Sequence, residues 1–578
     1  MTDVRSSRLS RALLLRMALL LAASIAVLLA LLLPQQENMA RWLDHWGFYG
    51  IAGSFGLWLL SLVPRVFRPG DVCATVRRHA PAAALCLALT VAAFLVSPPK
   101  FRILNDETNL VGVAMAMYEQ AEVWMPFNGL IFADSYQDLT HTFEKRPFTW
   151  PFCLFIIHSL LGYDGDNGFV LNFLACFGSL FFFHVLLRRW FSATTATLGV
   201  LFLACYPLFV IYATSSGFEV LNVCLVIMAF LFLDRHTRAP SSQELERLTA
   251  TLLLLAQCRY ESVVFLLALL PVALLVTPRT ELERVSPLLA LFPVLLTPMA
   301  WQRVLYSSPW KFKIGEVTHM FSTGYLLDNL AYAWRFFKGV HQEYATVPIV
   351  LYLALAGALL AVCTLLWRAR GRDLHLKAMA SAFVLSFLGV SAILFLYAFG
   401  NLTYRVSMRL GLIFLPVLAF FAVIPAHWLA RRWSWVPTCG LALAVTLLVL
   451  YWPVAAKNAA ITELHHYRIY NGVLDFLKTT YPNRDFLLVT DAPNQFVVHR
   501  MSSVYFPYAR ANLTPLVHML RQGVFKDILV AQQIDNATGT SLPVSAMPAD
   551  LPLQPVFTMP VEQTWSLRVS RIALAKTP

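Results

Sequence analysis

Long apolar runs separated by short polar segments dominate the chain. A bilayer core about 30 Å thick needs about 20 helical residues to cross it, so each run that approaches this length is a candidate span. Thirteen such runs are found, two of them about half-length: 12–33, 47–64, 81–96, 169–187, 194–213, 217–233, 248–257, 263–276, 287–301, 347–367, 378–399, 410–428 and 436–454. The pattern predicts a polytopic α-helical membrane protein with about 13 transmembrane helices.

Basic residues gather in alternate loops, which predicts the orientation of the spans. With the N-terminus in the cytoplasm, the short arginine-bearing loops all lie inside: 188–189, 235–238, 279–284, 368–372 and 431–432. The same choice places the longer loops 101–150, 302–346 and 401–409, and everything after residue 455, outside. The apolar stretch 148–161 is too short to cross comfortably. We expect it to be a juxtamembrane or re-entrant helix on the outer face, because counting it as a span would move every later arginine cluster outside.

After residue 455 the apolar runs give way to shorter elements. The pattern predicts helices at 467–477 and 513–521, and strands at 485–490, 527–530 and 565–574. This alternation indicates a small extracytoplasmic α/β domain over 456–578, which lacks a glycine-rich phosphate loop, HExxH or GxSxG and is expected to act as a cap. It follows a two-helix extension at 1–79 and a membrane catalytic domain at 80–455, whose outer loops are 98–150 and 302–346.

Composition excludes a soluble protein, with 58% hydrophobic residues, 13% charged residues and a mean hydropathy of +0.62. A net charge of +13 would suggest a nucleic-acid partner in a soluble chain. Here the basic residues flank apolar runs as orientation signals do, so we expect membrane lipids and no nucleic acid as partners. The nine cysteines form no CxxC pair, which supports neither a zinc knuckle nor a disulfide framework.

Candidate chemistry gathers on the predicted outer side. The first outer loop carries Asp106-Glu107 and, further on, Glu144-Lys145-Arg146-Pro147. Ionisable groups at membrane depth are costly and usually face a cavity, which singles out Arg259 and Glu261 in the turn between the two half-length runs. An internal Arg–Glu pair explains these two equally well. Glu219 opens a later span, where the helix dipole alone also favours an acidic residue.

In this order the motifs resemble those of the GT-C glycosyltransferases that use polyprenyl-phosphate sugars, particularly the aminoarabinose-transferase and protein-mannosyltransferase branch. The resemblance covers roughly 81–428, and Arg146 replaces the first proline of an EKPPL-like motif. The matching positions are Asp106-Glu107, Glu144 to Phe148, Glu219, Arg259-Tyr260-Glu261 and Tyr404-Arg405 ahead of Leu415-Pro416.

The resemblance implies roles for these residues. Asp106 would be the base for the acceptor, and Glu107 would assist it or raise its affinity for a proton. Lys145, Arg259 and Arg405 would hold the donor phosphate, which guanidinium groups match with parallel hydrogen bonds. The substrate-orienting set is Glu144, Glu219 and Glu261. No cofactor is indicated with certainty, and a divalent metal ion is possible, with Glu144, His141 and His319 as weak candidate ligands.

The predicted function is therefore transfer of a sugar, with inversion, from a polyprenyl-phosphate donor to an acceptor on the outer face of a bacterial inner membrane. A transporter or flippase of lipid-linked saccharides, or a polymerase or ligase, remains an alternative. The chain shows no obvious inverted repeat, and carboxylates rather than arginine and histidine dominate its first outer loop. The sugar and the glycan, lipid or protein acceptor stay open.

Overall fold

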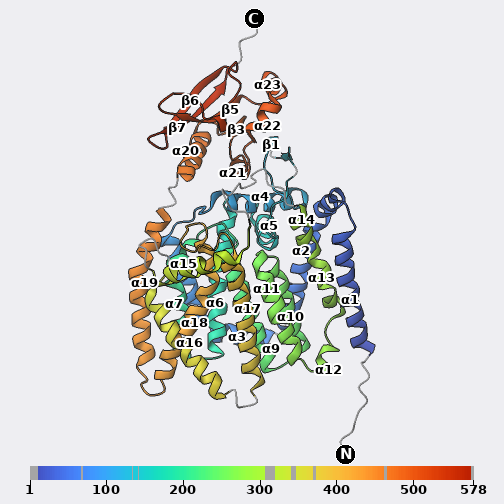
Figure 1. Ribbon diagram of the computed structural model, residues 1–578, viewed down its shortest axis with the longest axis vertical. Coiled ribbons are helices and arrows are strands. Elements are labelled where there is room, and N and C mark those ends of the chain that lie inside the picture. Colours follow the sequence, from blue (N-terminus) through green and yellow to red (C-terminus); the bar gives the residue numbers. More distant parts are fainter. Residues whose placement is uncertain are drawn as a thin grey trace, which may run out of the picture.

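The protein is a helical bundle with a smaller sheet domain at one end (Figure 1). The computed structural model describes residues 11–66, 69–132, 135–140, 142–305, 319–339, 346–368, 373–460 and 465–573. Helix α1 begins at the far end of the bundle, and the end that carries the sheet domain is called the domain-bearing end below. The predicted fold class, a polytopic helical protein with a C-terminal α/β domain, is confirmed.

Ten helical segments in the described residues are long and apolar enough to cross a membrane. The number is eleven if a pair of helices bent by 73° is counted as one span. The bent pair is α7 (Ala193–Ala204) and α8 (Pro207–Ala213), which together form one predicted run. The two half-length runs are the 15-residue α10 (Ser242–Ala256) and the 14-residue α11 (Val263–Val276). All thirteen runs are thus helical, but the two short ones fall below span length.

The remaining bundle helices overlap the predicted runs, with one exception. They are α1 (Arg11–Leu32), α2 (Gln36–Val66), α3 (Pro69–Val96), α6 (Asn167–Arg188), α9 (Glu219–Arg238), α12 (Arg279–Leu282), α13 (Phe292–Leu295), α14 (Thr297–Leu305), α16 (Pro348–Arg368), α17 (Leu374–Leu396), α18 (Leu415–Leu429) and α19 (Val436–Ala460). The exception is α12, and α2 and α3 begin well before the runs that they contain. The 310 segments η2 (Pro287–Leu291) and η4 (Met408–Phe414) lead into α13 and α18.

Helix α9 connects the two ends of the bundle. It begins with Glu219 and is 20 residues long, so its ends lie about 30 Å apart. Near its far end the fully buried Asp234 is paired with Arg189 and Arg238. The arginine-bearing ends of α6 and α9 therefore lie opposite the end where Glu219 lies, as the loop assignment expects.

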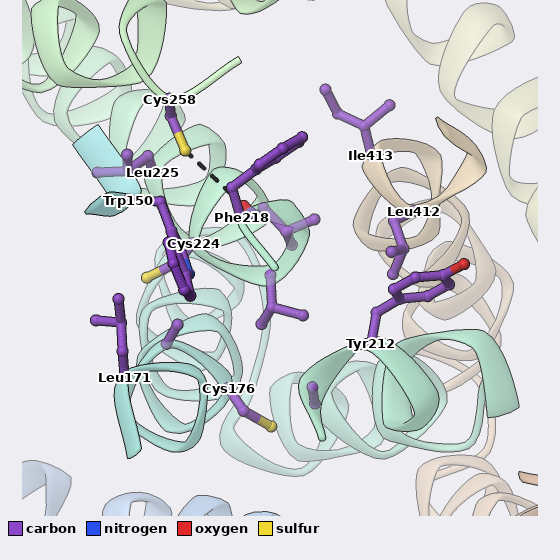
Figure 2. Close-up of a cluster of buried hydrophobic side chains, with 14 of the residues drawn as sticks. Trp150, Leu171, Cys176, Tyr212, Phe218, Cys224, Leu225, Cys258, Leu412 and Ile413 are labelled. Carbon is purple, nitrogen blue, oxygen red and sulfur yellow. Dashed lines mark hydrogen bonds between the residues drawn. The ribbon is translucent and has the colours of Figure 1, made fainter. Parts of the chain in front are cut away.

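The bundle core is built from aromatic, aliphatic and sulfur-containing side chains. Figure 2 shows Trp150, Cys224 and Leu225 packed together below Cys258, whose thiol donates to the carbonyl oxygen of Phe218 at 3.8 Å. This contact joins the turn after α10 to the residue that precedes α9. Packing here therefore fixes where α9 begins.

The domain-bearing end is covered by two helices from the first outer loop. Helix α4 (Leu104–Gln120) lies across this end, and α5 (Thr149–Leu161) enters the bundle beside it (Figure 1). Helix α5 has 13 residues, too few to cross a bilayer, which agrees with the juxtamembrane or re-entrant helix expected there. Residues 104–120 were expected to belong to an outer loop, so helix α4 was not predicted.

The C-terminal domain is a sheet with helices, in strand order β2-β1-β4-β3-β5-β7-β6. Strand β3 runs parallel to β4 and β5, whereas β7 pairs antiparallel with β5 and β6. Its own elements are α20 (His465–Thr480), β3 (Phe486–Thr490), α21 (Asn494–Val497), β4 (Ser503–Tyr505), α22 (Phe506–Ala511), α23 (Leu513–Arg521), β5 (Asp527–Asp535), β6 (Leu553–Pro560) and β7 (Trp565–Ile572). The five predicted elements are present, and β4 and β6 were not predicted.

Two strands of this sheet come from the first outer loop. The hairpin of β1 (Gly129–Phe132) and β2 (Ser135–Asp138) extends the sheet through antiparallel pairing of Gly129 with Ser503. The loop after α4 and the C-terminal domain thus form one folded unit. These two strands precede the predicted domain boundary at residue 456, and that division of the chain stays a prediction.

Helices α16 and α18 approach closely at Gly357. A Cβ atom placed there would lie 1.9 Å from the carbonyl oxygen of Phe421, whereas a Cβ at Gly56 of α2 would meet nothing within 4 Å. Small residues allow such close approach between membrane helices. We expect Gly357→Leu to destabilise the protein by about 1–3 kcal/mol through overpacking. Thermal unfolding in detergent measures this, and Gly56→Leu is the matched control. Equal effects of the two substitutions would contradict the close contact.

Candidate functional site

Asp106 lies in the first turn of α4 at the domain-bearing end and contacts two arginines. Its Oδ2 atom accepts a hydrogen bond of 2.5 Å from Arg409 of η4. Its Oδ1 atom forms an ion pair with Arg146, which lies just before α5. Three segments that are distant in the sequence therefore meet at one carboxylate.

Each of these arginines is shared with a second carboxylate. Arg146 lies 2.5 Å from Glu144, and Arg409 lies 3.1 Å from Glu219 at the start of α9. We call the series Glu144–Arg146–Asp106–Arg409–Glu219 the ion-pair chain. Its side chains are only 2% to 21% exposed. Charges buried to this degree are tolerated because each has a partner of opposite sign.

Hydrogen bonds to the backbone hold the Glu144 end of the chain in place. The Oε1 atom of Glu144 accepts from the backbone N–H of Lys145 at 2.9 Å, and its Oε2 atom accepts from Asn109 of α4 at 2.8 Å. Gln302 of α14 donates to the carbonyl oxygens of Glu144 and, at 2.6 Å, of Arg146. The turn that carries both residues is thereby fixed to the bundle.

The Glu219 end is fixed by a different amide. Asn172 of α6 donates to the carbonyl oxygens of Ser215 and Gly217, at 2.7 and 2.9 Å, and accepts from the indole of Trp150 at 3.0 Å. These bonds shape the loop between α8 and α9. Glu219 therefore enters the site from a rigid position rather than from a mobile loop.

The protonation of Asp106 depends on its arginine partners. Burial of Asp106 disfavours its charged form, but the charges of Arg146 and Arg409 outweigh this and hold its pKa well below the usual range. The effect is opposite to the raised proton affinity that Glu107 was expected to cause. While both arginines remain in contact, Asp106 is ionised and is a weak base.

Glu107 has the opposite character. Its Oε2 atom accepts from the backbone N–H groups of Arg102 and Ile103, at 2.5 and 3.2 Å, which satisfies donors at the start of α4. Burial and the nearby charge of Glu219 raise the pKa of Glu107 to about 8, in spite of these bonds. Glu107 therefore keeps a proton at pH 7 and takes part as a neutral group.

Arg259 and Glu261 form an ion pair of 2.6 Å and also line a cleft. The guanidinium lies 4.9 Å from the ring centroid of Phe218, and the cleft extends to Tyr260, Glu219, Asn222, Tyr397 and Leu412. The cleft is open on one side, and its volume, counted as space for the centres of water-sized groups, is about 30 Å³. In the described part of the chain, Nε of Arg259 and Oε2 of Glu261 have no hydrogen-bond partner. The pair is therefore internal and also borders the cleft, and contact of either residue with a substrate stays a prediction.

The other predicted phosphate ligands lie nearby in different settings. Lys145 is half-buried and interacts electrostatically with Asp106 and Glu144, and burial together with the charge of Arg146 lowers its pKa. Arg405 is half-buried in the segment before η4. Arg409, which lies four residues further along in η4, is the residue that pairs with Asp106 and Glu219. An arginine directly before the apolar run 410–428 was the sequence signal that could have identified it.

A metal site was a weak expectation based on three residues. Within the part of the chain that the structure describes, no group of three or more His, Cys, Asp and Glu side chains is placed to hold a metal ion. His141 lies outside the described residues, and His319 is exposed ahead of α15 (Leu326–Lys338). Glu144 is engaged by Arg146 and Asn109.

Comparison with protein families matches one segment of the chain, which includes Arg146 and Glu219 of the ion-pair chain but not Asp106, Glu144 or Arg409. Residues 145–301 match the family model described as dolichyl-phosphate-mannose-protein mannosyltransferase. No curated protein matches the chain. The match confirms the predicted resemblance to GT-C glycosyltransferases, and with it the predicted enzyme class, a glycosyltransferase.

Among solved structures, the chain is similar to ArnT from Cupriavidus metallidurans bound to undecaprenyl phosphate. The two share 12% identity and a TM-score of 0.48 over 84% of this chain and 97% of that one. It is also similar to the Archaeoglobus fulgidus oligosaccharyltransferase tethered with an acceptor peptide containing the NVT sequon via a disulfide bond. Identity there is 10% and the TM-score 0.45, over 82% of this chain and 75% of that chain.

Removing one arginine of the ion-pair chain should destabilise the protein. Arg409→Gln leaves Glu219 and one side of Asp106 buried without their cation, which costs about 3–5 kcal/mol. Adding Asp106→Asn should recover part of the loss, because one uncompensated charge is removed. Thermal unfolding of the single and double variants measures this coupling. Arg284→Gln, which breaks an ion pair whose arginine is 71% exposed, is the control and should change nothing measurable. Additive effects of the two site substitutions would contradict the shared contact.

The raised pKa of Glu107 predicts a specific pH dependence of stability. Between the ordinary carboxyl pKa and about 8 the folded state binds a proton that the unfolded state has released, so this group's contribution falls as pH rises through that window. We expect Glu107→Gln to remove this part of the decline. Unfolding temperatures measured from pH 5 to pH 9 for both proteins test it. Parallel curves would show that Glu107 has an ordinary pKa.

Proposed function

We propose that this chain, as a glycosyltransferase of the GT-C type, moves a sugar from a polyprenyl-phosphate donor to an acceptor on the outer face of the membrane, with inversion at the anomeric carbon. The observation that carries the proposal is the ion-pair chain, in which a carboxylate and two guanidinium groups meet at the domain-bearing end. Such a site offers a base for the acceptor and cations for a phosphate leaving group. We assign the membrane catalytic domain to residues 80–455.

The proposed reaction is a single in-line displacement. A lone pair of the acceptor hydroxyl or amine forms a bond to the anomeric carbon, and the bond from that carbon to the phosphate oxygen breaks. The polyprenyl phosphate leaves with the bonding electron pair. Asp106 takes the proton that the acceptor loses. Attack from the face opposite the phosphate inverts the configuration of the sugar.

Donor binding would activate Asp106. A phosphate group presents oxygen atoms of the kind that guanidinium groups bind with parallel hydrogen bonds. When the phosphate draws Arg146 and Arg409 towards itself, their hold on Asp106 weakens. Its proton affinity then rises towards that of a useful general base. Before the donor arrives, the same contacts keep the carboxylate ionised and unreactive.

The remaining charged residues would orient the substrates. Lys145 interacts electrostatically with Asp106 and Glu144, and its ammonium group would join the arginines at the phosphate. Arg259 has one unbonded guanidinium nitrogen in the cleft that also reaches Glu219 and Glu261. We assign Arg259 and Arg405 to the phosphate, and Glu144, Glu219 and Glu261 to the sugar and acceptor hydroxyl groups.

The proposed setting is a bacterial inner membrane, with the N-terminus cytoplasmic and the C-terminal domain periplasmic. Support comes from the separation along α9, whose first residue belongs to the ion-pair chain and whose last turn carries Arg235 and Arg238. Clustered arginines favour the cytoplasmic side. Carboxylates and donor would then meet on the periplasmic side.

The direct test replaces Asp106 in purified protein supplied with a radiolabelled polyprenyl-phosphate sugar. A general base contributes about 10²–10⁴ in rate, so Asp106→Asn should lower kcat by at least about a hundredfold. The matched control is Asp166→Asn, an exposed carboxylate near the start of α6 that lies outside the ion-pair chain. Transfer by Asp106→Asn at the wild-type rate, with equal folded protein, would exclude Asp106 as the base.

A further inference from the structure

Three side chains of the C-terminal domain contact helix α4 along its length. Gln495 donates to Asn105 in the first turn, at 2.6 Å between Nε2 and Oδ1. Arg500 forms an ion pair with Glu119 in the last turn. Between these contacts, Asn494 bonds to side chains in the second turn of the helix. One short segment, 494–500, therefore contacts α4 in its first, second and last turns.

The middle contact is made by a single buried amide. Asn494 donates from Nδ2 to Oδ1 of Asn109 at 2.6 Å and to Oγ1 of Thr108 at 3.2 Å. Asn494 is 4% exposed and Gln495 is 7% exposed. Buried amides that lose a partner cost about 1–3 kcal/mol each, so these bonds favour one position of α21 relative to α4.

Both amide contacts lead directly to the ion-pair chain. Asn105 immediately precedes Asp106 in the first turn of α4. Asn109 accepts from Asn494 through Oδ1 and donates to Glu144 through Nδ2 at 2.8 Å. The position of the C-terminal domain is thus linked through one residue to Glu144 and through one peptide bond to Asp106.

The strand pairing adds a second connection, through the backbone that follows α4. The chain leaves α4 and within a few residues enters β1, whose Gly129 pairs with Ser503 of the C-terminal sheet. Helix α4 is therefore attached to the domain through its side chains and through the backbone that follows it. A shift of the domain cannot leave α4 in place without breaking one of these contacts.

The phosphate-binding groups are attached elsewhere. Arg146 is fixed by the bond from Gln302 of α14, and Arg409 belongs to η4 in the bundle. Helix α4 contributes Asp106 to the site, whereas these cations come from other segments. Loosening α4 should therefore displace the base more than the backbone segments that carry the two arginines.

We propose that Asn494 and Gln495 are positioning residues, through which the C-terminal domain holds α4 so that Asp106 faces the acceptor. The inference rests on the proposed function, because it takes Asp106 as the base. It assigns the domain a share of kcat that the sequence did not indicate. Catalytic groups must be held to within about 0.5 Å of their working geometry, which a short helix needs neighbours to achieve.

An exchange of the amide pair tests the contact at the first turn. Gln495→Asn shortens one partner and should break the bond, and adding Asn105→Gln restores the combined length of the two side chains. We expect Gln495→Asn and Asn494→Ala each to lower kcat about tenfold, because small misplacements of a reacting group are costly. The KM for a polyprenyl-phosphate sugar should stay within about twofold, and the exchanged pair should recover most of kcat.

The control is Asn512→Ala, which removes an amide bonded within the same domain to the carbonyl oxygen of Tyr508. Hydrogen exchange of residues 104–120 provides an independent measure, and should rise in Gln495→Asn and Asn494→Ala but not in the control. Wild-type kcat in both of those variants, or a loss confined to donor KM, would overturn the inference. Asp106→Asn in the same assay separates the two proposals. If Asp106→Asn is inactive while Asn494→Ala and Gln495→Asn are fully active, the assignment of Asp106 as the base stands and only the positioning role is overturned.

Discussion

The site depends on the sharing of two guanidinium groups among three buried carboxylates. A carboxylate taken out of water loses several kcal/mol of hydration, and only a close cation recovers that loss. Because Arg146 and Arg409 each bridge two carboxylates, all three carboxylates of the ion-pair chain contact a guanidinium group. The same sharing joins α4, the segment before α5, η4 and α9, so the charges that serve chemistry also hold four separate parts of the chain together.

This arrangement explains how the site accommodates Arg146 at the position where the motif that it resembles has a proline. A proline would contribute a rigid turn and no charge. At this position the turn is instead fixed by Gln302 and by the backbone bonds of Glu144, so rigidity does not require the ring. The side chain is then available to neutralise Asp106 and Glu144. Loss of a conformational constraint is offset by bonds from a neighbouring helix, and a cation is added to the site.

The sequence predicted what depends on local patterns. Apolar runs of span length gave the bundle helices, because burial in lipid requires about 20 apolar residues whatever the neighbours are. The acidic residues were found because charge beside a membrane is rare. Arg409 was missed because its role depends on η4 meeting α4, which are about three hundred residues apart. The β1–β2 hairpin was missed for the same reason, since four-residue strands become recognisable only when Ser503 pairs with Gly129. For Arg409 and the hairpin, prediction failed because their contacts are non-local, not because the local propensity is weak.

The charge balance also bears on how the site meets its donor. The ion-pair chain holds three carboxylates and two guanidinium groups, and Glu107 adds no charge because it is protonated at neutral pH. A phosphate that entered this site alone would add negative charge to an already acidic set. Lys145, whose pKa burial lowers, supplies additional positive charge, whereas the charge of Arg259 is already balanced by Glu261 in their ion pair. Negative charge arriving with the donor strengthens the charged form of Lys145, so phosphate binding and full protonation of the lysine favour each other. Under the proposed function, Lys145 is therefore fully charged in the donor-bound state, in which Asp106 acts as the base.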